Sequence, residues 1–300
     1  MTDATILIPT HRHAAFLPYA VRSALAQTSV TVEVLVVGDG VDDDTRAAMS
    51  AFRDDERVRF FDFQKGERHG EHNRHLALQE AEGEIVCYLS DDDLLFPGHV
   101  LEMKRLLADA DLAHSTPVIV LPDGALRYRP ADLARPEFLA LIRVGRNNFI
   151  GLTGASHTRE FYERLPYGWR PAPLGTPSDL HMWQQMCAVP GFRGATATRL
   201  TAVAFPDPVW RELDEAVRAE TLETWLARAL RPEGEAELQG VLEAAVWRAA
   251  QDFKLRSIEL SVTLEEASHE LERLRAPLWR KAGRLLTRFG PVRALRERLG

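Results

Sequence analysis

The stretch Gly-Glu-Ile-Val-Cys-Tyr-Leu-Ser-Asp-Asp-Asp, residues 83–93, decides the fold of this chain. Its apolar run at 85–89 is typical of a buried strand, and three carboxylates, Asp91, Asp92 and Asp93, follow it directly. Adjacent carboxylates repel one another, so they destabilise a packed strand end unless a positive group lies beside them. The pattern therefore predicts a divalent cation, Mg²⁺ or Mn²⁺, because hard cations prefer oxygen ligands. The simpler alternative is a solvated acidic turn that caps the next helix.

Similar β-branched runs recur upstream and alternate with helical patterns. Strands are predicted at residues 5–8, 32–37, 58–61 and 85–89, with helices at 14–27 and 72–81. This alternation predicts an α/β fold with a largely parallel sheet. Ligands of such sheets bind outside the carboxyl ends of the strands, where this chain has Pro9 and Thr10 after the first strand and Asp39 after the second. We therefore expect polar and acidic side chains along one edge of the sheet.

Residues 122–208 are less regular, and we expect them to complete the same domain, which spans 1–208. The pattern indicates helices at 137–143 and 178–188 and a strand at 149–155. This half is expected to supply the other wall of a ligand cleft.

The composition is that of an ordinary globular protein. With 300 residues, 45% of them hydrophobic, the chain can bury one large core or two modest ones, which argues against widespread disorder. The two cysteines, Cys87 and Cys187, lie in apolar surroundings and are predicted to be buried thiols rather than a disulfide or a zinc site. No run approaches the roughly 20 apolar residues of a membrane span, and the N-terminus lacks the pattern of a secretion signal, so we expect a cytoplasmic protein.

The net charge of −7 is unevenly distributed along the chain. Residues 273–300 hold nine Arg or Lys against the single Glu297, so a basic end follows an acidic body. Residues 209–276 are predicted to be a helical extension with a short heptad seam, whose apolar members step by 4, 3, 4, 3 and 4 residues: Leu260, Leu264, Ala267, Leu271, Leu274 and Leu278. Such a seam suffices for a helical hairpin, or for a weak coiled coil that would join two copies as a homodimer.

Residues 277–300 are predicted to be a basic amphipathic tail. Apolar residues form one helical stripe, with Arg and Lys on the other face: Leu278, Trp279, Ala282, Leu285, Leu286 and Phe289. Helices of this kind lie on anionic membrane surfaces. A solvated or partner-binding tail is the alternative. Nucleic acid is disfavoured as a partner, because no aromatic platform or known binding motif accompanies the charge.

Three segments together resemble the family 2 glycosyltransferases with the GT-A fold. They are Ile-Leu-Ile-Pro-Thr-His-Arg at 6–12, Val-Leu-Val-Val-Gly-Asp-Gly at 34–40 with Asp-Asp-Thr at 43–45, and the 83–93 stretch. The similarity covers about the first 210 residues, with Gly38 where an Asp is common and His72 where an Arg is often seen. It implies a Rossmann-like, mixed but mainly parallel sheet flanked by helices, with a C-terminal helical extension here. It also implies transfer of a sugar from a nucleotide-diphosphate donor.

The resemblance assigns the donor side of the cleft residue by residue. It implies that Pro9, Thr10 and Arg12 border the nucleotide base, and that Asp39 accepts a hydrogen bond from the imide N–H of uracil or thymine. Asp91 would hold ribose or sugar hydroxyls, Asp93 would coordinate the metal that bridges the phosphates, and Asp92 would support the site. Asn73 or Arg74 would contact phosphate. The plain alternative for Asp39 is a turn residue between two glycines.

For the acceptor side, the candidate base is Asp179, in a segment that resembles the family's acidic motif followed by an aromatic residue. One base opposite the leaving group implies in-line displacement with inversion. A helix-capping Asp179 would look identical in sequence. His181 is a candidate metal ligand or acceptor contact, with a surface histidine as the alternative.

Further acceptor-side candidates are Gly151, Thr153 and Gly154, in a segment that is otherwise a plain buried strand. Trp169 is a candidate for stacking on a sugar, and a core residue is its alternative. A zinc site in the run of His69, His72 and His75 is disfavoured, because three-residue steps on a helix spread the rings over different faces.

The implied setting is surface-polysaccharide or glycolipid assembly at the inner face of the cell membrane, with a glycan or lipid-linked acceptor. A catalytically idle GT-A-like module for assembly or membrane recruitment is the alternative from another class. Retention of acids that repel one another argues against it. Nucleotidyl transfer is disfavoured because the N-terminal region has no loop rich in glycine and basic residues.

Overall fold

The computed structural model describes residues 2–145 and 148–288, with side chains up to residue 274. The chain divides into a compact unit, Met1–Val246, and a second unit from Trp247. The whole of the predicted tail, 277–300, which includes Leu278 of the predicted seam, therefore lies outside the residues whose side chains are described.

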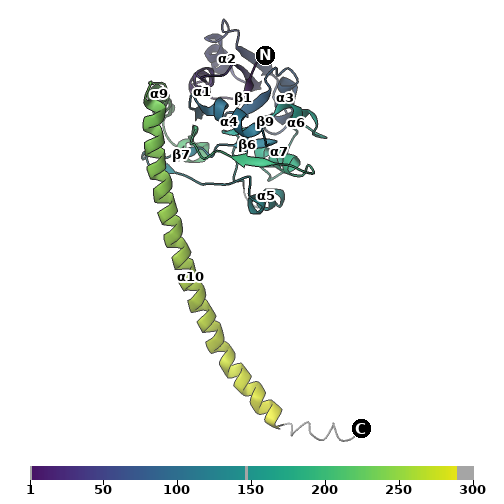
Figure 1. Ribbon diagram of the computed structural model, residues 1–300, viewed down its shortest axis with the longest axis vertical. Helices are drawn as coiled ribbons and strands as arrows, with labels where there is room; N and C mark the ends of the chain where they lie inside the picture. The colour runs from purple at the N-terminus through teal and green to yellow at the C-terminus, as the bar shows by residue number, and fades with distance from the viewer. Residues whose placement is uncertain (1, 146–147, 289–300) are drawn as a thin grey trace. The chain divides into compact units, whose positions relative to one another are not determined.

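A seven-stranded sheet forms the centre of the compact unit, in the order β10-β6-β9-β4-β1-β2-β3, and helices surround it (Figure 1). Its strands are β1 (Ala4–Thr10), β2 (Val32–Asp39), β3 (Val58–Phe63), β4 (Ile85–Tyr88), β6 (Leu112–His114), β9 (Ala155–Thr158) and β10 (Gly194–Thr196). β1 pairs in parallel with β2 and β4, and β9 is antiparallel to both β4 and β6. The four strands predicted in the first half of the chain and the mainly parallel sheet are confirmed.

The strand predicted at 149–155 is wrong, because β9 begins at Ala155. Gly154 stops a strand from extending upstream. Its φ is +87°, and a Cβ there would lie 2.3 Å from the Ser115 carbonyl oxygen. The residues before it therefore form a loop that reaches the carboxyl end of β4, where Gly154 N–H donates to the Tyr88 carbonyl.

Alternate side chains of the strands enter two cores, one on each face of the sheet. Ile6 and Ile8 face the core formed with α1 (Leu17–Leu25), α2 (Asp43–Ser50) and α4 (His99–Leu107). Leu7 faces the core on the opposite side, where α3 (Glu71–Leu78), α5 (Pro136–Arg143), α6 (Arg159–Glu163) and α7 (Ser178–Cys187) pack. Burial on both faces explains why these strands read as near-continuous apolar runs. Cys87 and Cys187 are buried free thiols, as predicted.

A smaller sheet carries a third core. Its order is β5-β11-β7-β8, from β5 (Leu94–Leu95), β7 (Val118–Val120), β8 (Leu126–Arg127) and β11 (Ala202–Ala204). Three helices cover it: α8 (Asp207–Trp210), α9 (Glu215–Ala229) and the first turns of α10 (Gly234–Arg288). Leu222 and Leu226 of α9 and Leu238 and Leu242 of α10 are fully or almost fully buried there. The compact unit thus extends past residue 208, because these helices complete its core.

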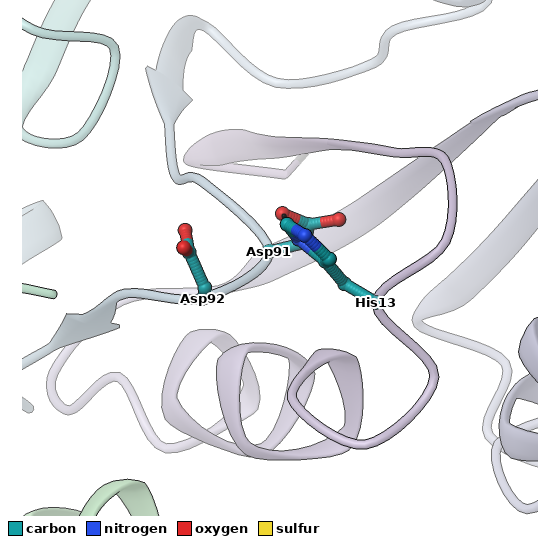
Figure 2. Close-up of side chains that lie close together, drawn as sticks. All are labelled: His13, Asp91 and Asp92. Carbon is teal, nitrogen blue, oxygen red and sulfur yellow. Dashed lines mark hydrogen bonds and ion pairs between the residues drawn. The ribbon is translucent and has the colours of Figure 1, made fainter. Parts of the chain in front are cut away.

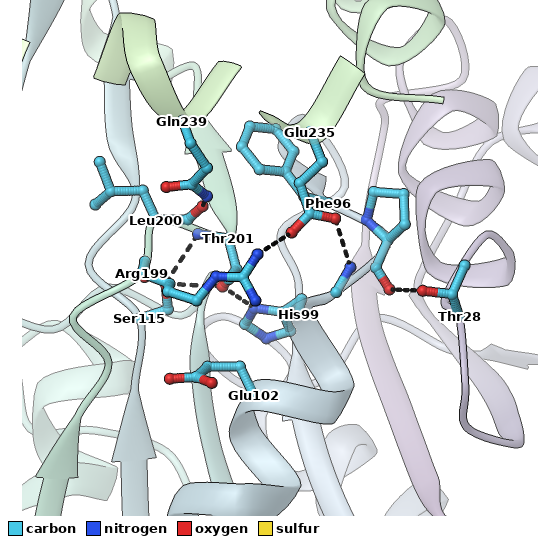
Figure 3. Close-up of polar contacts among 12 residues, drawn as sticks. Thr28, Phe96, His99, Glu102, Ser115, Arg199, Leu200, Thr201, Glu235 and Gln239 are labelled. Atoms are coloured by element: carbon cyan, nitrogen blue, oxygen red, sulfur yellow. Dashed lines mark hydrogen bonds and ion pairs between the residues drawn. The ribbon is translucent and has the colours of Figure 1, made fainter. Parts of the chain in front are cut away.

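Polar contacts fasten the start of α10 to the compact unit, close in sequence to the acidic loop formed by Asp91, Asp92 and Asp93 (Figure 3). The Glu235 carboxylate accepts hydrogen bonds from the Gly98 N–H at 3.1 Å and from Arg199 at 2.9 Å. Gln239 donates to the Leu200 carbonyl. Gly98 lies five residues after Asp93, so the helical extension contacts the segment that follows the three aspartates.

Among the described helices, none has a stretch both long and apolar enough to cross a membrane.

Candidate donor and catalytic cleft

A cleft of about 600 Å³ opens at the carboxyl ends of β1, β2 and β4. β2 and β3 lie on one side of β1 and β4 lies on the other, so the order of strands reverses at β1 although all four run parallel. Such a switch point is where open α/β sheets bind ligands. The structure brings most of the predicted site residues to its walls: Pro9, Thr10, Asp39, Arg74, Asp91, Asp92, Asp93, Gly151, Thr153 and Asp179.

Asp39, at the end of β2, is held by groups from the loop before α3. Its Oδ1 accepts hydrogen bonds from Gly66 N–H at 2.6 Å and Asn73 Nδ2 at 2.9 Å, and its Oδ2 accepts one from Lys65 Nζ at 2.5 Å. Asn73, predicted to contact phosphate, does not line the cleft and instead orients Asp39. Lys65 was missed by the sequence analysis, since an exposed lysine in a loop carries no distinctive signal.

Gly70 lets this loop close over Asp39. Its φ is +71°, and a Cβ there would lie 2.5 Å from the Asp39 carboxylate carbon. A side chain at this position would be strained in the left-handed region and would displace the carboxylate.

Asp91 meets His13 across the switch point between β1 and β4 (Figure 2). His13 Nδ1 lies 2.9 Å from Asp91 Oδ1. The hydrogen bond to Asp91 and the charges of Asp91 and Asp92 raise the pKa of His13 to about 9, although burial opposes this. Ligand atoms of His13, Asp91 and Asp92 all lie within 4.8 Å of one another, which makes them a candidate cation site. The sequence analysis did not predict His13. Its position three residues after the end of β1, at the ligand-binding edge of the sheet, is a sequence feature from which it could have been predicted.

Asp92 lies next to this pair and faces an arginine from the helical extension. Arg218 of α9 lies 3.5 Å from the Asp92 carboxylate and 3.3 Å from that of Asp207, with its guanidinium over the Phe16 ring. Burial, with the charges of Asp93 and Asp91, raises the pKa of Asp92 well above its usual value. No local sequence signal points to Arg218, because only packing of the third core brings α9 to the acidic loop.

Both carboxylate oxygens of Asp93 accept hydrogen bonds from other groups of the protein. Its Oδ2 accepts a hydrogen bond from the Thr153 hydroxyl at 2.5 Å, and its Oδ1 accepts one from the Phe205 N–H at 2.7 Å. Thr153 in turn accepts from the Ser90 N–H. Burial raises the pKa of Asp93 to about 6 against these bonds. Among the three aspartates, Asp93 therefore braces the loop, while Asp91 and Asp92 belong to the candidate cation site with His13.

Asp179 lies in the first turn of α7 and lines the cleft. Its Oδ2 accepts a hydrogen bond from Asn148 Nδ2 at 2.8 Å, and its Oδ1 accepts one from the Leu180 N–H at 2.8 Å. Burial raises its pKa, and these two bonds oppose the shift. Pro177 is the N-cap residue and makes no side-chain cap bond, so Asp179 does not occupy the capping position.

Three buried polar atoms of the cleft residues have no hydrogen-bond partner among the described residues. They are Thr10 Oγ1, Arg68 Nε and Arg74 Nε. The Arg74 guanidinium lies over the Trp169 ring at 4.9 Å and donates from its other end to the His69 carbonyl. Unsatisfied buried donors are costly, so a hydrogen-bonding ligand in the cleft would stabilise them.

Besides Asn73, four predicted residues do not line the cleft. Trp169 is only 2% exposed and packs edge-on against Tyr88 and Trp183, so the prediction that it stacks on a sugar is wrong. Arg12 is exposed, and its charge acts on Asp42. His181 lies against Arg170 Nε at 3.4 Å and does not belong to the cation group that the described residues form. Gly154 shapes the loop behind Thr153, as described above.

Comparison with known proteins gives relatives that match part of this chain. The GalNAc(5)-diNAcBac-PP-undecaprenol beta-1,3-glucosyltransferase of Campylobacter jejuni is 30% identical over 99 residues, which are 33% of this chain and 32% of that protein. The succinoglycan biosynthesis protein ExoO of Rhizobium meliloti is 32% identical over 146 residues, 46% of this chain and 40% of that protein. The matched region thus spans less than half the length of these relatives.

The fold is similar to that of solved structures, and the family model locates the match. The crystal structure of S. aureus TarS 1-349 has a TM-score of 0.55 and 14% identity, and the alignment covers 76% of this chain and 70% of that chain. At this identity the likeness shows the fold alone, which is the GT-A fold. Residues 5–164 match the model of glycosyl transferase family 2, just over half of the 300 residues. The chain therefore belongs to glycosyl transferase family 2.

Proposed function

We propose that this protein transfers a sugar, with inversion, from a UDP- or dTDP-type donor to a hydroxyl of a glycan or lipid-linked acceptor. The observation that carries the proposal is the cleft itself. It gathers Asp39, the acidic loop and Asp179 from distant parts of the chain, with buried donors left unpartnered. These groups match, in turn, a nucleotide base, a diphosphate and an acceptor hydroxyl.

The donor half of the proposal rests on Asp39 and Arg74. A carboxylate accepts from the imide N–H of uracil or thymine and cannot pair with N3 of cytosine, which is itself an acceptor. Arg74 and Thr10 offer donors to phosphate or sugar oxygens deeper in the cleft. A crystal structure of S. aureus TarS, whose fold is similar, is described as a complex with UDP-GlcNAc.

The residues present fit a divalent cation. His13, Asp91 and Asp92 would hold Mg²⁺ or Mn²⁺, and the imidazole nitrogen favours Mn²⁺, because Mg²⁺ demands oxygen ligands. A bound cation supplies charge that stabilises the leaving diphosphate. Asp93 keeps the loop that carries these ligands in place through Thr153 and Phe205.

The acceptor half rests on Asp179. Its Oδ atoms line the cleft, and Asn148 orients the carboxylate. A base at this position removes the proton of the acceptor hydroxyl as that oxygen attacks the anomeric carbon from the side opposite the diphosphate. In-line displacement by this route inverts the anomeric centre.

Thermal-shift measurements against a panel of nucleotide sugars with Mn²⁺ test the donor assignment. We expect UDP- or dTDP-sugars to raise Tm by about 5–10 °C at 100 times Kd, since saturation to that degree adds about 2.7 kcal/mol. CMP-sugars should give no shift, and Asp39→Ala should abolish the selective shift. A panel in which the CMP-sugar stabilises the protein as much as the UDP-sugar would reject the role of Asp39.

The acceptor and the cellular setting follow from the relatives and the tail. The C. jejuni relative is named for an undecaprenol-linked substrate and the R. meliloti relative for succinoglycan biosynthesis. The basic C-terminal sequence would hold the enzyme at the inner face of the cell membrane, near a lipid-linked acceptor.

Deletion of residues 277–300 tests the membrane proposal. The full chain should sediment with vesicles that contain anionic lipid but not with neutral vesicles, and the deletion should weaken this binding at least tenfold, because each basic residue near the surface contributes about 1 kcal/mol. High salt should weaken the full chain in the same way. Equal binding of the two proteins to anionic vesicles would refute the anchor.

A further inference from the structure

Helix α10 presents a long apolar face after the compact unit ends at Val246. Every residue of α10 from 250 to 274 is exposed in the single chain. The face includes Phe253 at 75%, Leu260 at 70% and Leu264 at 69% exposure. A contiguous exposed apolar face of this size marks an interaction surface.

The exposed residues repeat with the period of a coiled coil. Because α10 is continuous, the seam predicted from Leu260 onward extends back by three positions on the same helix, to Ala250. Its members from residue 250 step alternately by 3 and 4: Ala250, Phe253, Ser257, Leu260, Leu264, Ala267, Leu271 and Leu274. An average spacing of 3.5 residues between apolar positions keeps the stripe facing a second helix along a coiled coil. A helix that packs on a globular core instead shows an apolar period of 3.6 residues.

We propose that this seam pairs with the same seam of a second copy, as an antiparallel coiled-coil dimer. The register that aligns the seam sets Leu260 of one protomer against Leu264 of its partner. The same register sets Phe253 against Leu271 and the small Ser257 against the small Ala267. Every seam residue from 250 to 274 then faces another seam residue, so no large side chain is left exposed at the interface.

Charge decides between the two orientations. Four glutamates lie in the half 262–274, Glu265, Glu266, Glu270 and Glu272, against the single Arg273. A parallel pair would place these acidic halves side by side, which is unfavourable. The antiparallel pair places each against the half 250–262, where Lys254 and Arg256 balance Asp252 and Glu259, so the acidic halves are kept apart. Arg256 and Glu270 each directly precede a seam residue, Ser257 and Leu271. Residues at this flanking position face each other across an antiparallel pair, so Arg256 of one protomer lies beside Glu270 of its partner.

The mass of the full chain in solution tests the dimer. Light scattering after gel filtration at micromolar concentration should give twice 33.7 kDa. The double variant Leu260→Glu, Leu264→Glu should raise the dimer dissociation constant at least 100-fold, because it places four carboxylates at the centre of the seam. Glutamate is a good helix former, so the helix content measured by circular dichroism should not change.

A matched control uses two apolar residues of the same helix that lie off the seam. Ile258→Glu, Val262→Glu adds the same charge, and both residues are also exposed, at 49% and 48%. This control should remain dimeric. A monomeric wild-type chain, or a control that dissociates while the seam variant does not, would overturn the proposal.

Cross-linking tests the orientation. A short thiol cross-linker should join Phe253→Cys protein to Leu271→Cys protein when the two are mixed, and neither variant alone should cross-link. In a parallel dimer each variant would instead cross-link to itself, since residue 253 would face residue 253. The antiparallel pair separates the two copies of residue 253 by about 27 Å, beyond the reach of the reagent. The natural Cys87 and Cys187 are buried and give no background.

Discussion

Replacing Asp179 with Asn is expected to lower the rate of transfer about a thousandfold, since a positioned general base contributes between about 10² and 10⁴. The amide keeps the size and the hydrogen-bonding reach of the carboxylate but cannot take up a proton. Asp179 lies on the acceptor wall, so the dissociation constant of the nucleotide diphosphate should change less than about twofold. Release of nucleotide diphosphate from the donor that the thermal-shift panel selects measures the rate, and calorimetry measures binding.

The neighbouring variant Asn148→Ala provides a control with a different signature. Asn148 donates to the ionised form of Asp179 and so lowers the pKa of this carboxyl, against the effect of burial. Without this bond the pKa rises, and the acid limb of the rate profile should move to higher pH while the plateau at high pH is preserved. Retention by Asp179→Asn of more than a tenth of the wild-type rate would show that Asp179 is not the base.

The second large effect separates Asp92 from Asp93. Asp92→Ala is expected to raise the dissociation constant for Mn²⁺ at least about 100-fold, because removal even of a group behind a ligand costs 10- to 100-fold. Its effect on the Tm of the metal-free protein should be small, because the relief of repulsion from Asp91 and Asp93 offsets the loss of the ion pair with Arg218, which keeps its contact with Asp207.

Asp93→Ala is expected to act on stability instead. It leaves the Thr153 hydroxyl and the Phe205 N–H without their acceptor, and each buried unsatisfied donor costs about 1–3 kcal/mol. The Tm of the metal-free protein should therefore fall by about 5–15 °C. Calorimetric titration with Mn²⁺ and thermal unfolding without metal distinguish the two variants. Loss of metal binding in Asp93→Ala with an unchanged Tm would instead make Asp93 the ligand that the family resemblance implies.

Local sequence patterns were sufficient for the elements that build the sheet. The apolar runs of β1, β2, β3 and β4 are buried on both faces, so each residue of the run reports the same environment and the pattern is unambiguous. Asp39 and the three aspartates follow directly at strand ends, which is why their place at one edge could be predicted. The strand before Gly154 was mispredicted, because the positive φ of Gly154 and its close approach to the Ser115 carbonyl are not visible in the local sequence.

Local sequence patterns predicted four neighbouring strands of the seven-stranded sheet, the edge on which the acids gather, and Asp179 at the start of a helix. What each acid faces depends on tertiary packing. His13 reaches Asp91 across 78 residues of chain, and Arg218 reaches Asp92 from a helix outside the region that matches the family. Tertiary packing also buries Trp169 in the core and brings the Thr153 hydroxyl into hydrogen-bonding distance of Asp93. These strands follow from local apolar runs, because both faces of the sheet are buried, whereas the partner of a charge depends on packing between segments that carry no signal of one another.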